Sequence, residues 1–210
     1  MRANNLLFIF LVIAIIFVLI NISITFIKIY NFKKDLIGYA SGYVNITINT
    51  LITINMSRDT VNWSSGMINS SFGNATLYTS GENAGIVLRG NWSGANAKAF
   101  IIENIGNVNS SLSIQTSKNA HDFFNSTSSS NEEYMLNVTD KEIGSCINSS
   151  ALGIWQDVNK TSGGTKFCSQ FGFRKNSNEI YIDILLTVPS DLGNIGEQFD
   201  TITIIGDAVN

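Results

Sequence analysis

The chain begins with an uninterrupted apolar segment. Over residues 6–20, fifteen successive positions carry no polar side chain, and the apolar character continues to Ile29. A helix over residues 6–27 would be about 33 Å long, enough to cross a bilayer core of about 30 Å. Because the segment is apolar on every face, it does not resemble the core helix of a soluble protein. We predict a membrane-associated helix over residues 1–29, followed by a stalk over residues 30–42.

Beyond the stalk the hydrophobic pattern changes to a period of two. Apolar residues alternate with polar ones through Val44, Ile46 and Ile48, and again through Ile52 and Ile54. This pattern is typical of a half-buried β-strand, so we predict strand structure over residues 43–56. Further strands are expected near residues 75–79, 84–89, 97–103, 110–115, 133–138, 167–173, 179–188 and 200–205, and one helical turn within residues 117–124.

The clearest of these strands is 179–188, which ends at Pro189, the one proline of the chain. Because it follows next along the chain, the segment 200–205 is expected to pair with it. Short strands without intervening helices are typical of antiparallel sheets. The sequence therefore predicts a mainly β protein in which residues 43–210 form one antiparallel β-sandwich, of jelly-roll or immunoglobulin-like type.

Charge limits the class of protein. Only 14% of the 210 residues are charged, and the net charge is −3. An ordinary soluble domain is about 25% charged, and a nucleic-acid-binding protein needs a basic face that neutralises phosphates. We therefore do not expect this protein to bind nucleic acid.

Asparagine is abundant and its spacing is not random. There are 26 Asn residues, and twelve stand two positions before Ser or Thr, where chance would give about five. Such sites accept N-linked glycans on translocated surfaces. One of them, Asn21, lies in the apolar segment. The other eleven are predicted glycosylation sites: Asn45, Asn55, Asn62, Asn69, Asn74, Asn91, Asn109, Asn125, Asn137, Asn148 and Asn159.

Three interpretations of the apolar segment remain open. The first is a retained transmembrane anchor. The second is a cleaved secretory signal, for which the nearest small-residue site is Gly38-Tyr39-Ala40. The third is a pilin-like helix processed after a short basic leader that contains Arg2.

The flanking charges bear on orientation. Arg2 precedes the segment, whereas Lys28, Lys33 and Lys34 follow it. The positive-inside rule alone would place the C-terminal side in the cytosol. Long C-terminal domains are translocated despite such charges, and the remaining sequence has extracellular features. We therefore expect a cytoplasmic-membrane protein with an extracellular C-terminal domain.

Cys146 and Cys168 are the only cysteines. Two thiols without neighbouring histidines are too few for a zinc site, and their spacing does not match a redox pair. In an extracellular domain the expected outcome is one disulfide. Free buried thiols are the alternative.

Residues typical of catalysis are few. His121 is the single histidine, and it is expected at the surface or with its hydrogen bonds satisfied. The adjacent Glu132 and Glu133 do not resemble the carboxylates of a glycosidase, which face each other across a cleft, so we expect solvated loop charges. No hydrolase, zinc or phosphate-loop motif occurs. We predict neither catalytic residues nor a cofactor.

Two further groups of residues are candidates for ligand binding. Asp191, Glu197 and Asp200 supply oxygen ligands of the kind that Ca²⁺ prefers, but their spacing matches no calcium loop, and no metal is predicted. Trp63 and Trp92 both lie within Asn-Trp-Ser glycosylation sites. An exposed Trp stacks on sugars, whereas a buried Trp completes a core. They are candidate sugar-binding residues.

Several segments resemble archaeal cell-surface β-sandwich proteins and, more distantly, bundling pilins and TasA-type fibre subunits. They are Gly38–Ile48, Val61–Gly66, Ile102–Val108, and Val188–Asp191 leading through Gly196 to Thr201–Ile204. The resemblance implies a jelly-roll-like domain used as a building block of a surface or filament. The chain lacks the clean cleavage site of the fibre subunits.

Together these patterns predict a non-enzymatic cell-surface protein with a structural or adhesive role. Its expected partners are the membrane, N-linked glycans, and copies of itself or other envelope proteins. The alternatives are a pilin-like filament subunit assembled through its N-terminal helix, and a tethered carbohydrate- or ligand-binding module.

Overall fold

The computed structural model describes residues 2–35, 46–47, 49–127, 132–193 and 195–209. The chain divides into two units, Met1–Ile48 and Asn49–Asn210, and each is described by itself. Asn45 and most of the predicted stalk lie outside the described residues. The second unit begins at residue 49, six residues later than the predicted start at 43.

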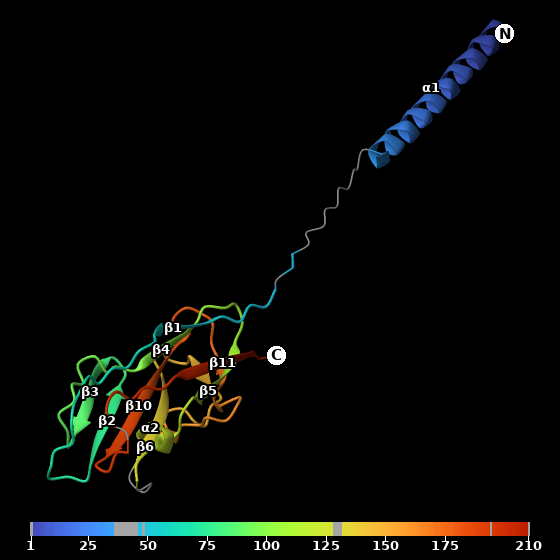
Figure 1. The fold of residues 1–210 in the computed structure, drawn as a ribbon. Helices are drawn as coiled ribbons and strands as arrows, with labels where there is room; N and C mark the ends of the chain where they lie inside the picture. The colour runs from blue at the N-terminus through green and yellow to red at the C-terminus, as the bar shows by residue number, and fades with distance from the viewer. Residues whose placement is uncertain (1, 36–45, 48, 128–131, 194, 210) are drawn as a thin grey trace. The chain divides into compact units, whose positions relative to one another are not determined.

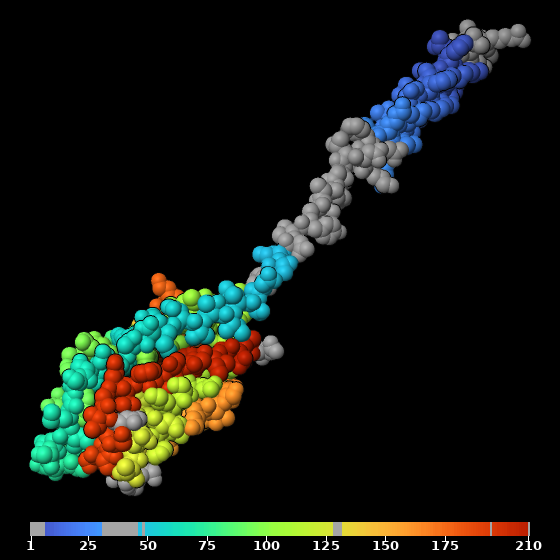
Figure 2. Space-filling model, in the orientation of Figure 1, coloured from blue at the N-terminus to red at the C-terminus, as the bar shows by residue number. Residues whose placement is uncertain are grey.

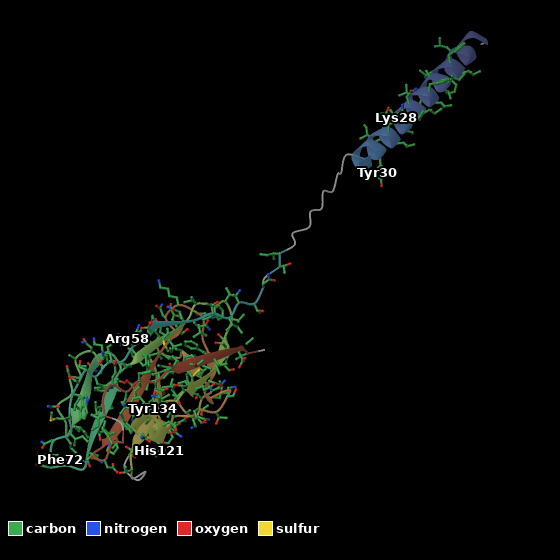
Figure 3. All side chains as sticks on the ribbon, viewed as in Figure 1. Lys28, Tyr30, Arg58, Phe72, His121 and Tyr134 are labelled. Carbon is green, nitrogen blue, oxygen red and sulfur yellow. A yellow bond between two sulfur atoms is a disulfide. The ribbon has the colours of Figure 1, made fainter. Side chains whose placement is uncertain are left out.

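The first unit contains one long helix, α1 (Arg2–Asp35) (Figure 1). Within it, the 24 residues Leu7–Tyr30 are long and apolar enough to cross a membrane, and none is buried in the structure. The helix runs six residues past the predicted end at residue 29. Figure 3 shows its side chains projecting outward, with Lys28 and Tyr30 near the C-terminal end.

The three polar side chains in the apolar part of α1 hydrogen-bond to the helix itself. Asn21 Nδ2 donates to the Phe17 carbonyl at 2.9 Å, Ser23 Oγ to the Leu19 carbonyl at 2.9 Å, and Thr25 Oγ1 to the Asn21 carbonyl at 2.8 Å. Polar groups in a bilayer must be satisfied internally. These bonds would satisfy the three side chains if the helix lay in a bilayer.

The second unit is an antiparallel β-sandwich, which confirms the predicted fold class (Figure 1). One sheet has seven strands and the other has four. The larger sheet contains β1 (Ile54–Arg58), β2 (Asn74–Ser80), β3 (Asn83–Leu88), β4 (Phe100–Asn104), β6 (Glu133–Asp140), β8 (Gln156–Asp157) and β10 (Glu179–Pro189). The smaller contains, in spatial order, β11 (Ile202–Ala208), β5 (Ser110–Thr116), β9 (Thr165–Phe171) and β7 (Cys146–Ile147).

The core lies between the two sheets. Alternate residues of each strand point inward, as the period of two requires. The larger sheet contributes the fully buried Leu77, Ile102, Ile180 and Ile182, and the smaller contributes Leu112, Phe167 and Phe171.

A short helix covers one end of this core. Helix α2 (Ala120–Phe124) begins with a capping box between Asn119 and Asp122, and it buries Phe123 and Phe124. The predicted helical turn is thus confirmed. The Phe123 ring packs on Tyr134 with 5.4 Å between ring centroids.

Strand β10 is the central strand of the larger sheet. One side pairs with β6 along Ile180–Thr187. The other side pairs first with β4, over 179–182, and then with β2, over 185–189. The sheet therefore forks at Asp183 and Ile184.

The side chain of Asp183 fills this fork. Its Oδ1 accepts hydrogen bonds from Thr79 Oγ1 and from the Gly81 amide, each at 2.8 Å. Thr79 Oγ1 in turn accepts from the Ile184 amide at 2.9 Å. Both side chains are buried. The backbone groups that lose their strand partners at the fork are thereby satisfied.

Two expectations about strands are wrong. Strand β11 pairs with β5 in the smaller sheet and not with β10, because the segment that follows Pro189 carries the chain to the other layer. The predicted strand 43–56 forms a strand only from Ile54 onward among its described residues. Residues 51 and 53 accept hydrogen bonds from the amides of Asn107 and Ile105 instead.

Replacement of Asp183 by Ala should lower the free energy of unfolding by about 2–4 kcal/mol, because the buried Thr79 hydroxyl and the half-buried Gly81 amide lose their acceptor. Denaturant titration followed by tryptophan fluorescence measures this, since all three Trp residues lie in the β-sandwich. The matched control is Asp59→Ala at an exposed position, expected within about 0.5 kcal/mol of wild type. Equal losses for the two variants would contradict a structural role for Asp183.

Candidate functional site

The predicted disulfide is present. Cys146 in β7 and Cys168 in β9 are bonded, with 5.6 Å between their Cα atoms. Both residues are buried. The loop between them holds β8, a strand of two residues, and little other sheet structure. The disulfide therefore joins a weakly paired part of the chain to the smaller sheet.

The glycosylation candidates lie at the surface. Asn45 falls outside the described residues, and none of the other ten residues is buried. Six are exposed: Asn55, Asn62, Asn69, Asn91, Asn125 and Asn148. Four are half-buried: Asn74, Asn109, Asn137 and Asn159.

Three of these sites have a local structural use as well. The Oδ1 atom of Asn62 accepts from the Ser64 amide at 2.7 Å, and Asn69 and Asn159 accept in the same way from residues 71 and 161, at 3.2 and 2.8 Å. An Asn that bonds to the amide two residues later forms an Asx turn. Turn formation therefore gives these three asparagines a structural role beside glycan acceptance, but it does not require Ser or Thr two positions later.

The candidate sites are distributed unevenly over the two sheets. Strands of the larger sheet contain Asn55, Asn74 and Asn137. The four strands of the smaller sheet contain no asparagine at all. Glycans on these sites would project from the larger sheet and from loops, and not from the strands of the smaller sheet.

The two candidate sugar-binding tryptophans have different surroundings. Trp63 is 9% exposed and belongs to the core. A Cβ atom at Gly85 would lie 2.6 Å from the Trp63 ring, so only glycine permits this packing. Trp92 is half-buried, and Gly66 and Gly90 lie against its ring. Trp63 offers no free face to a sugar.

The two adjacent glutamates lie in different environments. The Glu132 side chain is only 4% exposed, so the expectation of a solvated loop charge is wrong for this residue. Its Oε1 lies 3.0 Å from His121 Nδ1, and Ser126 Oγ donates to its Oε2. The His121 ring itself is 55% exposed at the end of the domain that also holds Tyr134 (Figure 3). Through its contact with His121, Glu132 thus connects the segment before β6 to α2.

Glu133 faces the outer side of the larger sheet. Thr187 Oγ1 donates to its Oε2 at 2.6 Å. The two carboxylates therefore bind different neighbours and do not converge on one cleft. The pair cannot act as an acid and a base on a common substrate. No local pattern indicated the burial of Glu132, because His121 reaches it only through the tertiary fold.

The three carboxylates considered for calcium do not form a site. Asp191 Oδ2 accepts from Thr127 Oγ1 at 3.0 Å, and Asp200 Oδ1 accepts from the Ser117 amide at 3.1 Å. Within the described part of the chain, no three or more His, Cys, Asp or Glu residues are arranged to hold a metal ion.

A shallow cleft of about 450 Å³ lies between three loops near Glu103, Glu142 and Asn178. Several of its polar groups are bonded to one another. Glu142 Oε2 accepts from the Asn178 amide at 2.9 Å, and Asn178 Nδ2 donates to the Asn104 carbonyl at 3.1 Å. These groups hold the loops together and do not present a set of free catalytic residues.

Arg58 of β1, Glu82 of the turn between β2 and β3, and Tyr181 of β10 form a cluster on the larger sheet. Arg58 Nη2 lies 2.5 Å from Glu82 Oε2, and the Tyr181 hydroxyl donates to Glu82 Oε1 at 3.1 Å. The hydrogen bond from Arg58 is the main reason why the pKa of Glu82 lies below its usual value. Partial burial, together with Glu82, raises the pKa of Tyr181 to about 12. At neutral pH Glu82 is therefore ionised and Tyr181 keeps its proton, so the carboxylate can accept the hydrogen bond that holds these elements together.

Comparison with known proteins gives no relative: no family model, no curated protein and no solved structure matches the chain. The class defined by the structure is a β-sandwich with one disulfide, preceded in the chain by an apolar helix. Function therefore has to be argued from the residues themselves.

Removal of the disulfide, by Cys146→Ala together with Cys168→Ala, should lower the free energy of unfolding by about 3 kcal/mol. The cause is the greater freedom of the unfolded chain once the loop is open. Denaturant titration of wild-type and double-variant protein, each with and without a reductant, measures it. Wild type should lose stability on reduction and the variant should not; an unchanged wild type would contradict the prediction.

Trp63→Ala should cost about 3–5 kcal/mol because it leaves a cavity against Gly85 and Ala97. Trp92→Ala should cost less, since that ring is partly solvated. Thermal unfolding followed by circular dichroism compares them. A larger loss for Trp92→Ala would contradict the assignment of Trp63 to the core.

Proposed function

We propose that this chain is a non-enzymatic, membrane-anchored cell-surface protein with a structural or adhesive role. The observation that carries the proposal is a single domain that combines an internal disulfide with ten Asn-x-Ser/Thr sites, none of them buried. Disulfides persist in oxidising compartments outside the cytosol. N-linked glycans are added at such sites during translocation.

The helix supports the anchoring part of the proposal. Leu7–Tyr30 has the length and composition of a membrane span, and its polar side chains are satisfied within the helix. We propose that it is retained as the anchor and that the β-sandwich faces outward. The lysines after the span oppose this orientation, but a folded domain of this size is translocated largely regardless of nearby charge.

The surface supports a structural role. The carboxylates and amides of the cleft near Glu142 are bonded to one another, and the buried Glu132 is held by His121 and Ser126. Polar groups engaged in this way stabilise loops. The proposed partners are the membrane, attached glycans, and other copies of the chain or other envelope proteins. The resemblance to archaeal surface β-sandwich proteins points in the same direction.

Mass spectrometry of the native chain, purified from the membrane fraction, tests the proposal. We expect an N-terminus at or next to Met1, an intact disulfide, and hexose-bearing peptides that include exposed sites such as Asn55 and Asn91. Peptides treated with a glycosidase that releases N-linked glycans serve as the control.

Other results would redirect the proposal. A chain that starts near Asn4 would indicate a processed pilin-like subunit, and one that starts near Ser41 a released domain. Unmodified asparagines together with reduced cysteines would contradict the extracellular location. In that case the lysines at residues 28–34 would be the better guide to orientation.

A further inference from the structure

The unpaired edge of β11 differs from the other sheet edges of the described domain. Strands β7 and β8 have two residues each. The edge of β3 is covered, because the Gly85 amide donates to the Gly94 carbonyl at 2.8 Å. Strand β1 has an irregular register at Met56 and Arg58 and carries the glycosylation candidate Asn55. These are common ways in which proteins block sheet edges.

None of these protections occurs on β11. Its seven residues pair with β5 without any shift in register. The strand contains no proline and no basic residue, and Asp207 is its single charge. Figure 2 shows its dark red atoms at the surface of the domain, beside the cyan segment that precedes β2. A long, regular and mostly apolar edge of this kind is a template for another strand.

The hydrogen-bond pattern identifies the groups that face outward. The Ser117 amide donates to the Thr201 carbonyl at 3.0 Å, and the Val209 amide donates to the Asn109 carbonyl at 3.2 Å. The odd-numbered residues of β11 therefore bond to β5. In an antiparallel sheet, alternate residues bond on opposite sides. The amides and carbonyls of the four even-numbered residues thus point to the free edge: Ile202, Ile204, Gly206 and Ala208.

Segment 52–54 covers the inner face of β11 and leaves these groups unbonded. A Cβ atom at Gly206 would lie 3.0 Å from Ile54 Cγ1 and 3.5 Å from Ile52 Cγ2. Within the described part of the chain, no hydrogen bond reaches the outward amides of β11.

We propose that β11 pairs antiparallel with β11 of a second copy of this chain, about a two-fold axis at Ile205. This inference deepens the proposed function and rests on it, since it names a copy of the chain as the partner. Ile205 lies opposite Ile205 of the second copy, Ile204 opposite Gly206, and Ile202 opposite Ala208. The two four-stranded sheets become one continuous sheet.

The sequence of β11 is complementary to itself in this register. All outward backbone groups find partners, because only even-numbered residues face each other as hydrogen-bonded pairs. Asp207 lies opposite Thr203 of the second copy, whose hydroxyl can donate to the carboxylate. A register centred on Asp207 would instead bring two like charges together, which is destabilising. A two-fold axis is also the commonest symmetry of protein dimers.

The distribution of glycosylation candidates favours a second copy at this sheet. The strands β5, β7, β9 and β11 contain no asparagine, so a continuous sheet across the axis would carry no glycan on its strands. The residues beside Ile205 and Thr203 on β5 are Ser113 and Gln115, which are half-buried and uncharged. One glycosylation candidate, Asn109, lies just past the paired residues, where its carbonyl accepts from the Val209 amide, one residue beyond the end of β11.

Oxidative crosslinking of the purified full-length chain in detergent tests the register. Ile205→Cys places two thiols in a directly opposed, non-hydrogen-bonded pair with Cα atoms about 4.5 Å apart, within the range of a disulfide. We expect a covalent dimer on a non-reducing gel. Thr203→Cys is the matched control: its symmetry mate is displaced by four residues, about 13 Å along the strand, so the chain should stay monomeric.

A second variant separates pairing from folding. Ala208→Pro removes an amide that faces the free edge and leaves the bonds to β5 intact. Added to Ile205→Cys, it should reduce the covalent dimer several-fold while the thermal unfolding of the reduced protein stays unchanged. Mass spectrometry should find the bond between Cys146 and Cys168 intact in every variant.

Equal crosslinking of Ile205→Cys and Thr203→Cys would overturn the proposed register. A monomer in both would overturn the β11 interface itself. Neither result bears on anchoring, location or glycosylation, which the N-terminal and glycopeptide masses test separately. The crosslinking uses purified protein and an added oxidant, so it gives its answer whichever side of the membrane the domain occupies.

Discussion

Backbone pairing along both sides of β10 is the constraint on which the β-sandwich depends. This strand is eleven residues long and mostly buried, and it joins β6 on one side to β4 and β2 on the other. A strand with two different partners on one side has a gap where they separate. Buried backbone groups in such a gap must find other partners, at a cost of about 1–3 kcal/mol each if they do not. The carboxylate of Asp183 and the hydroxyl of Thr79 supply those partners, which explains why two polar side chains are buried in an otherwise apolar layer.

Where the chain forms little sheet structure, away from β10, polar side chains and one disulfide hold its segments in place. The part of the chain between β6 and β9 forms only two short strands of two residues each. The disulfide fixes its two ends, and the buried Glu132 holds the segment before β6 to α2. Asparagines at residues 62, 69 and 159 close turns through their own side chains. In a chain with a single proline, Asn and Gly provide the turn geometry that proline supplies elsewhere.

The two sheets present different surfaces to solvent. The larger sheet carries glycosylation candidates within its strands and has both edges irregular or covered. The smaller sheet has no asparagine in its strands and ends at the regular, unpaired β11. This asymmetry connects the two proposals. A glycan-bearing side suits contact with the surroundings, and a bare side suits contact with a copy of the chain. The low charge of the domain is compatible with both roles, since amides and hydroxyls, and the proposed glycans, would hydrate such a surface.

Elements that depend on a local pattern could be predicted from the amino-acid sequence alone. The apolar segment identified the helix, and alternation of polar and apolar residues identified eight later strands to within a few residues. The α2 turn and the pairing of the only two cysteines also followed from local or compositional signals. The candidate glycosylation sites and the disulfide could also be named from the sequence. The first are recognised by the spacing of Asn before Ser or Thr, and the second by the presence of two cysteines.

Which elements pair with one another could not be predicted from these local patterns. The pattern of β11 is the same whether it pairs with β10 or β5, because a period of two specifies a buried face and not a partner. The segment 49–53 alternates like a strand, and the carbonyls of residues 51 and 53 accept hydrogen bonds from residues 107 and 105 in the register of β1 with β4, but β1 itself begins only at Ile54. Glu132 was expected to be solvated and Trp63 was open between a core position and sugar binding; the side chains of both are buried, because His121 and Gly85 approach them from other parts of the chain. Burial and pairing are properties of contacts between segments, and a single sequence encodes those contacts only through the fold as a whole.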